Sequence, residues 1–375
     1  GSISLEKVQL KCGPSAYSLL NNKTANIIDS ILSGYGGVSN SKTGNLLASN
    51  SLFDGTYSSI YNQGSMNLAD IHINSGSYGI YNESSTINNQ IIIDKLAIQQ
   101  KNGTSGCAVY NRCGSMKIND FETNGSINNY TNSTLEIATG TINYQLVNSG
   151  TATINNLNLN YDETGSNYSS ARNIVTNTGI LNLSNFDMKI VKINYGEVRS
   201  VVNNGTLNMV DSNLNVEKNA SGNLYGIYQD NGLINYTNSN IDVSIGSTVY
   251  GVYVKNGNIG ILSGSINANN KTNAYGIYIE NGTVTLGEAE DPSSEVYGTE
   301  NANVSITNPS IKAIGTITGI GVKRVNGYFN FYDGIITGST NAKPDITSTV
   351  EYKYQVENYR DSDNYEYCIL EYMKY

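Results

Sequence analysis

The chain has 375 residues, of which 38% are apolar and only 14% are charged, and its formal net charge is −9. Roughly 57 residues are asparagine, and 29 are tyrosine. A charged helical bundle or a coiled coil is excluded, because such proteins consist largely of Ala, Glu, Lys, Leu and Arg. Disorder is excluded too, since Ile, Val, Leu and Tyr recur along nearly the whole length and can bury a core.

Charge and hydropathy also exclude some classes of binding partner. An acidic chain with dispersed Lys and Arg does not attract phosphate backbones, so we expect no nucleic acid. No apolar run approaches the roughly 18 residues of a membrane span, so we expect no membrane insertion. The chain opens Gly1-Ser2-Ile3-Ser4 in strand-like sequence without a signal peptide. We interpret it as a monomeric piece of a larger protein, with Gly1-Ser2 a cloning scar.

Cysteine usage predicts free thiols. The four cysteines are Cys12, Cys107, Cys113 and Cys368. They are too few and too scattered for a disulfide framework. Cys107 and Cys113 lie about one short strand apart, too far to bridge if that strand is straight.

A motif of tyrosine, glycine, an aliphatic residue and tyrosine recurs along the chain. The clear copies are Tyr78–Tyr81, Tyr225–Tyr228, Tyr250–Tyr253 and Tyr275–Tyr278. Weaker copies end at Tyr61, Tyr110, Tyr130, Val147, Val175 and Val202, with a degenerate one near Val322. Periods of about 20 to 50 residues are typical of solenoids and propellers.

Each repeat contains three short strands. An Asn-Gly pair such as Asn256-Gly257 follows the motif, and two alternating apolar triplets separated by Asp, Asn or Gly come next. Such alternation is typical of strands. A propeller blade would need four strands in about 40 to 45 residues. The repeat therefore predicts one coil of an all-β parallel β-helix, with about thirteen coils between Ile27 and Ile335.

The chain is expected to divide into a β-helix and a cap. The β-helix covers residues 1–343, with irregular N-terminal coils and an insert at 287–303. The tail, residues 344–375, alternates twice around a turn, which predicts a C-terminal β-hairpin over 350–372. We expect this hairpin to cover the last coil, since that coil otherwise exposes unpaired backbone groups. The residues expected to face that coil are Tyr352, Tyr354, Val356, Tyr367 and Ile369.

Two segments and the repeated motif carry a family resemblance. Asn281–Gly287, Phe329–Gly338 and the Tyr-Gly-Ile-Tyr-Asn motif look like repeats of large bacterial cell-surface proteins. Over residues 24–338 the chain resembles the right-handed parallel β-helix domains of adhesin-like proteins from gut Gram-positive bacteria. This resemblance implies a right-handed helix and an extracellular or cell-surface location. Pectate lyases and other polysaccharide-cleaving enzymes share the fold, so the fold alone does not decide the function.

Acidic residues recur at one turn of the repeat: Asp70, Asp120, Asp211 and Asp333. Stacked carboxylates could bind Ca²⁺ or act as an acid–base pair. Asn156, Asn185 and Asn238 take the same place in other coils, however, and Asp and Asn interchange where a side chain holds a turn. We favour the turn interpretation. His72, the single histidine, alternates with Ile71 and Ile73 and is expected to point outward.

Two charged segments raise the possibility of catalysis or metal binding. The densest cluster consists of Arg172, Lys192 and Arg199 with Asp187, Glu197 and Asp211. It is either a lyase-like groove or a set of solvated loop charges, and we favour the latter. The acidic insert over 287–300 lacks the alternating spacing of a tight Ca²⁺ loop. We therefore assign no catalytic residue, metal or cofactor.

The tyrosines are the strongest candidates for a binding site. The position of Tyr278 tolerates tyrosine, valine and Gly321, whereas the position of Ile277 is aliphatic in almost every coil, so Tyr278 is expected to face out. The glycine of the motif is expected to share that outer face and leave flat space beside the ring. Sugars could then stack on the rings, although neighbouring rings could equally pack against each other. The candidate ligand-binding residues are Tyr228, Tyr253, Tyr278, Tyr61, Tyr81 and Tyr110.

The sequence thus favours a non-catalytic, adhesin-like β-helix rod that is secreted or at the cell surface and binds glycan or a host surface through tyrosine stripes. The alternative is a polysaccharide lyase or glycoside hydrolase of the pectate-lyase-like fold. An enzyme should show clustered acids and a base in a cleft, whereas a binding protein should show a flat tyrosine stripe.

Overall fold

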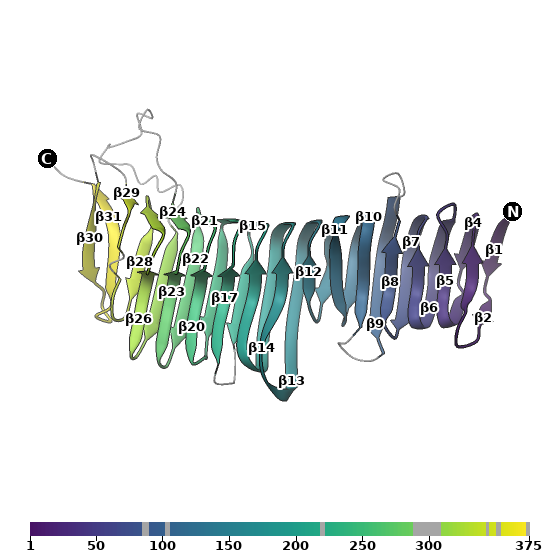
Figure 1. Cartoon of the computed structure of the whole chain (residues 1–375), viewed down its shortest axis with the longest axis horizontal. Helices are drawn as coiled ribbons and strands as arrows, with labels where there is room; N and C mark the ends of the chain where they lie inside the picture. Colours follow the sequence, from purple (N-terminus) through teal and green to yellow (C-terminus); the bar gives the residue numbers. More distant parts are fainter. Residues whose placement is uncertain are drawn as a thin grey trace, which may run out of the picture. The chain divides into compact units, whose positions relative to one another are not determined.

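The computed structural model describes residues 1–84, 90–101, 106–217, 222–287, 309–342, 345–349 and 354–372. All regular structure in these ranges is β-strand, and they contain no helix that could cross a membrane. The strands stack in parallel in a solenoid-like arrangement that is consistent with a β-helix (Figure 1). The all-β fold with stacked parallel strands is therefore confirmed. The insert at 287–303 lies outside the described residues except for Gly287.

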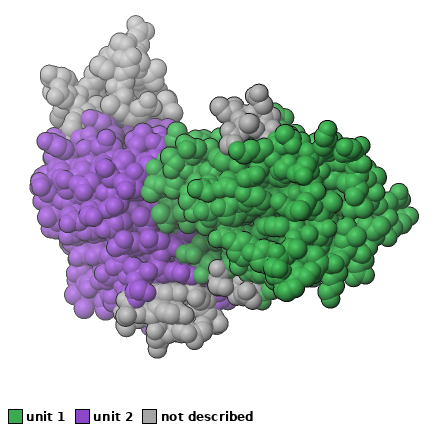
Figure 2. Space-filling model, turned by 45° about the vertical axis from the view of Figure 1, so that its right-hand side comes forward, with its two compact units in different colours: residues 1–161, 175–182 green, residues 162–174, 183–375 purple. Residues whose placement is uncertain are grey.

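The chain packs into two compact units, drawn in green and purple in Figure 2. Unit 1 comprises residues 1–161 and 175–182, and unit 2 comprises residues 162–174 and 183–375. The strands of unit 1 are β1 (Ser2–Glu6), β2 (Gln9–Lys11), β3 (Tyr17–Asn21), β4 (Thr24–Ile28), β5 (Ile31–Asn40), β6 (Asn45–Asn62), β7 (Ser65–Ser75), β8 (Tyr78–Glu83), β9 (Gln90–Gln100), β10 (Cys107–Thr123), β11 (Ser126–Ile142) and β12 (Leu146–Asn148). Two long strands, β13 (Thr151–Asn177) and β14 (Ile180–Asn203), contribute to both units.

The remaining strands belong to unit 2. They are β15 (Thr206–Val210), β16 (Asn213–Glu217), β17 (Asn223–Gln229), β18 (Leu233–Thr237), β19 (Ser239–Ser244), β20 (Thr248–Val254), β21 (Asn258–Ile261), β22 (Gly264–Asn270), β23 (Asn273–Ile279), β24 (Thr283–Leu286), β25 (Ser310–Gly315), β26 (Thr318–Arg324), β27 (Tyr328–Phe331), β28 (Ile335–Gly338), β29 (Ser348–Thr349), β30 (Tyr354–Arg360) and β31 (Glu366–Tyr372).

Three consecutive coils of unit 2 repeat the same three strands. β17 pairs with β20 and β20 with β23, all in parallel. The series β18, β21, β24 and the series β19, β22, β25 follow the same rule. Each strand therefore hydrogen-bonds to its equivalent one coil later, as the repeat spacing predicts.

Unit 1 builds its coils from longer, bent strands. β6 pairs with β7 over Asn45–Gly55 and with β8 over Ser58–Asn62. One strand thus supplies two sides of a coil. β10 does the same against β8 and β9, with a register shift between Asn111 and Cys113.

Alternation places every second side chain of a strand in the core. Ile234, Ile259, Val284 and Phe329 lie in register on successive strands and are all buried. Burying a side chain of this kind stabilises the fold by roughly 1.5 to 3 kcal/mol. Tyr236 is also inside, and its hydroxyl donates to the carbonyl of Ser265 at 2.8 Å.

Left-handed residues turn the chain at one corner of the coils. Those with φ between 45° and 54° are Lys7, Asp29, Asn50, Asp70, Asn156, Asn185, Asp211 and Asn238. Asp and Asn tolerate this conformation because their side chains bond locally. The turn interpretation is confirmed for Asp70 and Asp211. Asp333 also holds a turn, because its Oδ1 accepts a hydrogen bond from the backbone N–H of Gly334 at 2.7 Å, and here Gly334 has the positive φ of 106°. Asp120 is not among the residues with positive φ.

The register corrects two of the predicted repeat positions. Asn128, not Tyr130, is the partner of Tyr110, and Tyr130 lies in β11 where the register with β10 shifts. Lys323, not Gly321, is the partner of Tyr278. Both errors come from aligning residues by type rather than by backbone pairing.

The tail forms the expected hairpin. β30 and β31 are antiparallel, and β31 adds to the open edge of β28, with Cys368 opposite Ile336. Tyr352 lies outside the described residues. Tyr367 and Ile369 are only half-buried, whereas Cys368 between them is fully buried. The predicted alternation was therefore reversed here, since Cys368 takes the side that the buried Ile336 also takes.

All four cysteines are free thiols, as predicted. Cys107 and Cys368 are buried, and Cys12 and Cys113 are half-buried. Burial raises the pKa of the Cys107 thiol to about 12, so this thiol stays protonated and unreactive at neutral pH.

Candidate functional site

The tyrosines of unit 2 form two columns along the stacking direction. The first tyrosine column consists of Tyr225, Tyr250 and Tyr275, with ring centroids 4.8 and 5.2 Å apart. The second tyrosine column consists of Tyr228, Tyr253 and Tyr278, with both separations 5.2 Å. Within a column the rings are nearly parallel, and between columns they meet edge to face. These are the favoured geometries of aromatic pairs.

The second column lies on the outer side of its strands, stacked in register as expected. Ile227, Val252 and Ile277 point into the core on the opposite side and are buried. Tyr253 and Tyr278 are half-buried, and Tyr228 is 8% exposed. The motif glycine does not share this outer face, contrary to expectation. A Cβ on Gly226 would point inward and lie 2.6 Å from a methyl group of Ile241.

Stacking uses up the ring faces in the second column. Tyr253 has Tyr228 on one face and Tyr278 on the other, each 5.2 Å away. No sugar ring fits into that space, because close packing leaves about 3.5 to 4.0 Å between non-bonded carbon atoms. The rings are left with their edges and hydroxyl groups for any ligand.

Charged groups surround the second column. The Arg199 guanidinium lies over the Tyr228 ring at 3.9 Å from its centroid, and it is also paired with Glu197. A cation in this position stabilises the stack by roughly 0.5 to 2 kcal/mol. The Tyr253 hydroxyl donates to Glu280 Oε2 at 2.6 Å. Burial, followed by the Glu280 carboxylate, raises the pKa of Tyr253, so its hydroxyl remains a donor.

The candidate residues of unit 1 form a second patch of the same kind. Tyr81 and Tyr110 stack at 4.6 Å, and Tyr61 and Tyr81 meet at 5.5 Å with a tilt of 36°. The Tyr61 hydroxyl donates to Glu83 at 2.6 Å, and Arg112 pairs with the same carboxylate. The Tyr61 hydrogen bond and the Arg112 charge hold the pKa of Glu83 below its ordinary value. The patch is therefore a set of packed rings beside an ionised carboxylate whose charge is balanced by Arg112.

A buried asparagine ladder runs through unit 1, and sequence reasoning missed it. Each side-chain amide donates to the next amide oxygen at 2.7 to 2.9 Å. The members of the ladder are Asn21, Asn40, Asn62, Asn82, Asn111, Asn129, Asn148 and Asn177. A signal was present, because an asparagine directly follows the motif in several copies, as Asn82 follows Tyr81.

The ladder is cut short in unit 2. Asn203 donates to Gln229 Oε1 at 2.9 Å, but the next equivalent residue is Val254. Gln229 Nε2 is accordingly buried without a hydrogen-bond partner. The columns of tyrosine continue where the ladder of amides does not.

The three acids of the predicted charge cluster have separate partners in the described part of the chain. Asp187 accepts a hydrogen bond from Asn213 at 2.7 Å, and Asp211 accepts one from Asn238. Glu197 is taken up by Arg199. The Lys192 side chain lies outside the described part of the chain.

His72 is exposed, as predicted, with Nε2 4.0 Å from Asp70 Oδ1. Asp70 also lies 3.7 Å from Lys95 Nζ. In the part of the chain that the structure describes, no three His, Cys, Asp or Glu side chains gather to hold a metal.

Comparison with known proteins gives no match to any family model, curated protein or solved structure.

Proposed function

We propose that this chain is a segment of a non-catalytic, adhesin-like β-helix of the right-handed parallel type, with about thirteen coils, secreted or displayed at the cell surface. It presents tyrosine and asparagine side chains for weak, multivalent contact with glycans or a host surface. The observation that carries the proposal is the second tyrosine column, three rings in register on the outer side of β17, β20 and β23.

Contact is made through ring edges and hydroxyl groups, because the faces of Tyr253 are covered by its neighbours. A hydroxyl hydrogen bond contributes about 0.5 to 1.5 kcal/mol. One tyrosine therefore binds nothing measurable, and affinity comes from several residues or several molecules acting together. Tyr61, Tyr81 and Tyr110 give unit 1 a patch of the same chemistry.

The partners of the acids favour binding over polysaccharide cleavage. A glycosidase needs two carboxyl groups about 5 to 9.5 Å apart on either side of the scissile bond. Asp187 and Asp211 hold asparagines of the adjoining coil instead, and Glu197 is paired with Arg199. These contacts are structural contacts within and between coils.

The test replaces Tyr228, Tyr253 and Tyr278 by Phe together, which removes the hydroxyls and keeps the stacked rings. We expect binding on a glycan array or to host cells to fall to background while the melting temperature barely moves. Tyr236→Phe is the matched control, because its hydroxyl is inside the core. Unchanged binding by the triple variant, or no binding by the unaltered chain, would refute the proposal.

A further inference from the structure

A polar hollow of about 620 Å³ lies at the Asn-Gly turns of unit 2. These turns lead from β17 to β18, from β20 to β21, from β23 to β24 and from β26 to β27. The hollow, called the Asn-Gly groove below, thus crosses several successive coils. It differs from the second tyrosine column both in residues and in chemistry.

Glycine backbone forms one wall of the groove. Gly257, Gly282 and Gly327 have φ values of 84°, 117° and 75°, which non-glycine residues rarely adopt. A Cβ on Gly327 would lie 2.2 Å from the carbonyl oxygen of Gly282. The stacked turns therefore exclude side chains here, and bare peptide groups line the space.

Amides and one aromatic ring line the rest. Asn281 Nδ2 donates to Asn256 Oδ1 at 2.7 Å. Each amide has two N–H donors and an oxygen acceptor, so this bond leaves capacity for a ligand. Asn258, Thr283 and Tyr328 lie in register on successive strands. The step between them, about 4.8 Å, is close to the length of one pyranose residue.

Tyr328 differs from the tyrosines of the columns. Its residue surface is 62% exposed, and among the described residues no other ring stacks on it. An open aromatic face is a large flat apolar surface, on which the C–H face of a pyranose can lie. Tyr253 cannot do this, because both of its faces are covered.

The charges of the groove cancel. Its charged residues are Asp230 and Lys255, whose side chains form an ion pair of 2.8 Å. An anionic sugar finds no unpaired cation there. Among the described residues that line the groove there is no aliphatic side chain, so the side chains of a peptide find no apolar pocket. A neutral polyhydroxyl ligand is the chemistry that fits.

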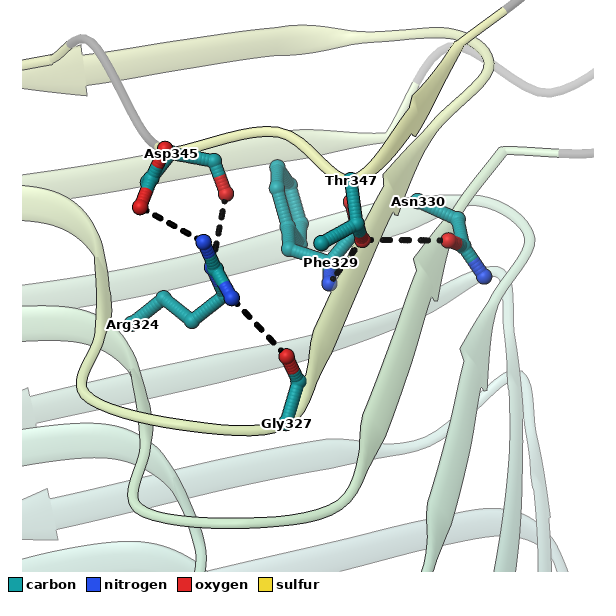
Figure 3. Close-up of polar contacts among 6 residues, drawn as sticks. All are labelled: Arg324, Gly327, Phe329, Asn330, Asp345 and Thr347. Atoms are coloured by element: carbon teal, nitrogen blue, oxygen red, sulfur yellow. Dashed lines mark hydrogen bonds and ion pairs between the residues drawn. The ribbon is translucent and has the colours of Figure 1, made fainter.

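Hydrogen bonds hold the turn at the end of the groove, and Figure 3 shows those made by Arg324 and Thr347. Arg324 donates to the carbonyl of Gly327 at 2.9 Å and also to the backbone and carboxylate of Asp345, at 2.9 and 2.5 Å. Thr347 Oγ1 accepts a hydrogen bond from the Phe329 backbone N–H at 2.8 Å. The turn that carries Tyr328 is therefore fixed before a ligand arrives, which reduces the entropy lost on binding.

We propose that the Asn-Gly groove binds a neutral oligosaccharide along the coils, with one sugar ring on Tyr328 and its neighbours hydrogen-bonded to Asn256 and Asn281. This inference rests on the proposed function in one respect, that the ligand is a glycan, and it assigns the ligand class and a separate site.

The experiment titrates the full chain with neutral tetrasaccharides of β-1,4-linked glucose, β-1,4-linked N-acetylglucosamine and α-1,4-linked glucose, and with tetragalacturonate as the anionic counterpart. At least one neutral probe should bind and the anionic probe should not. Tyr328→Ser should lose roughly threefold to tenfold in affinity. Tyr328→Phe keeps the ring and should bind like the unaltered chain. The double change Asn256→Leu and Asn281→Leu should abolish binding.

The outcomes separate the two proposals. Loss of array binding in the triple Tyr→Phe variant, with Tyr328→Ser unaffected, sinks the groove and leaves the proposed function standing. Neutral tetrasaccharides that still bind to the triple variant and lose affinity in Tyr328→Ser support the groove alone. Binding of tetragalacturonate in preference to the neutral tetrasaccharides overturns the ligand class. Melting curves of each variant identify any that fails to fold. If Tyr328→Ser is one of these, the double change Asn256→Leu and Asn281→Leu carries the comparison.

Discussion

At the scale of single residues, the asparagine ladder explains how so polar a chain can bury amide groups inside unit 1. A buried amide is costly unless its donors and acceptor are satisfied. Asn40 shows how this is met, since Nδ2 donates to Asn62 Oδ1 at 2.7 Å and to the carbonyl of Ser65 at 2.9 Å. The ladder therefore fixes both the neighbouring side chain and the neighbouring backbone.

We predict that Asn111→Ala destabilises the chain by about 1 to 3 kcal/mol, the cost of leaving buried polar groups without partners. Asn111 is fully buried, accepts from Asn82 at 2.8 Å and donates to the carbonyl of Thr134 at 3.1 Å. Urea unfolding measures the change. Asn132→Ala, at an exposed position, should change stability by less than about 0.5 kcal/mol. Equal effects of the two changes would show that the ladder adds no stability.

At the scale of elements, the C-terminal hairpin closes an edge. β28 would otherwise offer unpaired N–H and C=O groups to another chain. β31 satisfies them in antiparallel register from Ile335 to Gly338. The fully buried Cys368 anchors the hairpin, with Sγ 3.8 Å from the carbonyl oxygen of Ala342.

We predict that a chain ending at Lys343 associates into oligomers, whereas a chain ending at Tyr372 stays monomeric. Light scattering after size-exclusion chromatography gives the mass of each. If the shorter chain remains monomeric and melts at the same temperature as the longer one, the hairpin has no protective role.

At the scale of the whole molecule, the tyrosines make stability depend on alkaline pH. Burial raises the pKa of Tyr225 to about 12, and a hydrogen bond with Tyr130, followed by burial, raises that of Tyr110 to about 12. The ordinary value is about 10. Folding therefore favours the neutral rings, and this stabilisation is complete below pH 10 and lost as the pH rises towards about 12.

We predict a melting temperature that is steady up to about pH 10 and falls steeply between pH 10 and 12. The near-ultraviolet absorbance of tyrosinate should rise together with the loss of structure. A full rise of that absorbance near pH 10 in a chain that is still folded would contradict the packing of the columns.

The sequence predicted the pairing of strands between coils better than it predicted which side chains lie on the surface. A spacing of 25 residues from Tyr225 to Tyr250 and on to Tyr275 is enough to predict strand pairing, because each coil must bond to its equivalent. Alternation could not show that Gly226 and Ile227 both face inward, since a period of two describes a straight strand and not a bend. Composition alone could not separate asparagines in turns from those in the ladder, because the residue type is the same and only burial differs.

The match between neighbouring coils has a genetic consequence. β17–β19 and β20–β22 offer the same partners in the same register to the coil that follows. Duplication or deletion of one 25-residue unit by unequal recombination would add or remove one ring from each column and keep the same backbone pairing between the remaining coils. The gene can therefore gain or lose whole repeat units here without compensating mutations elsewhere. We expect related chains to differ in the number of coils before they differ in the structure of a single coil.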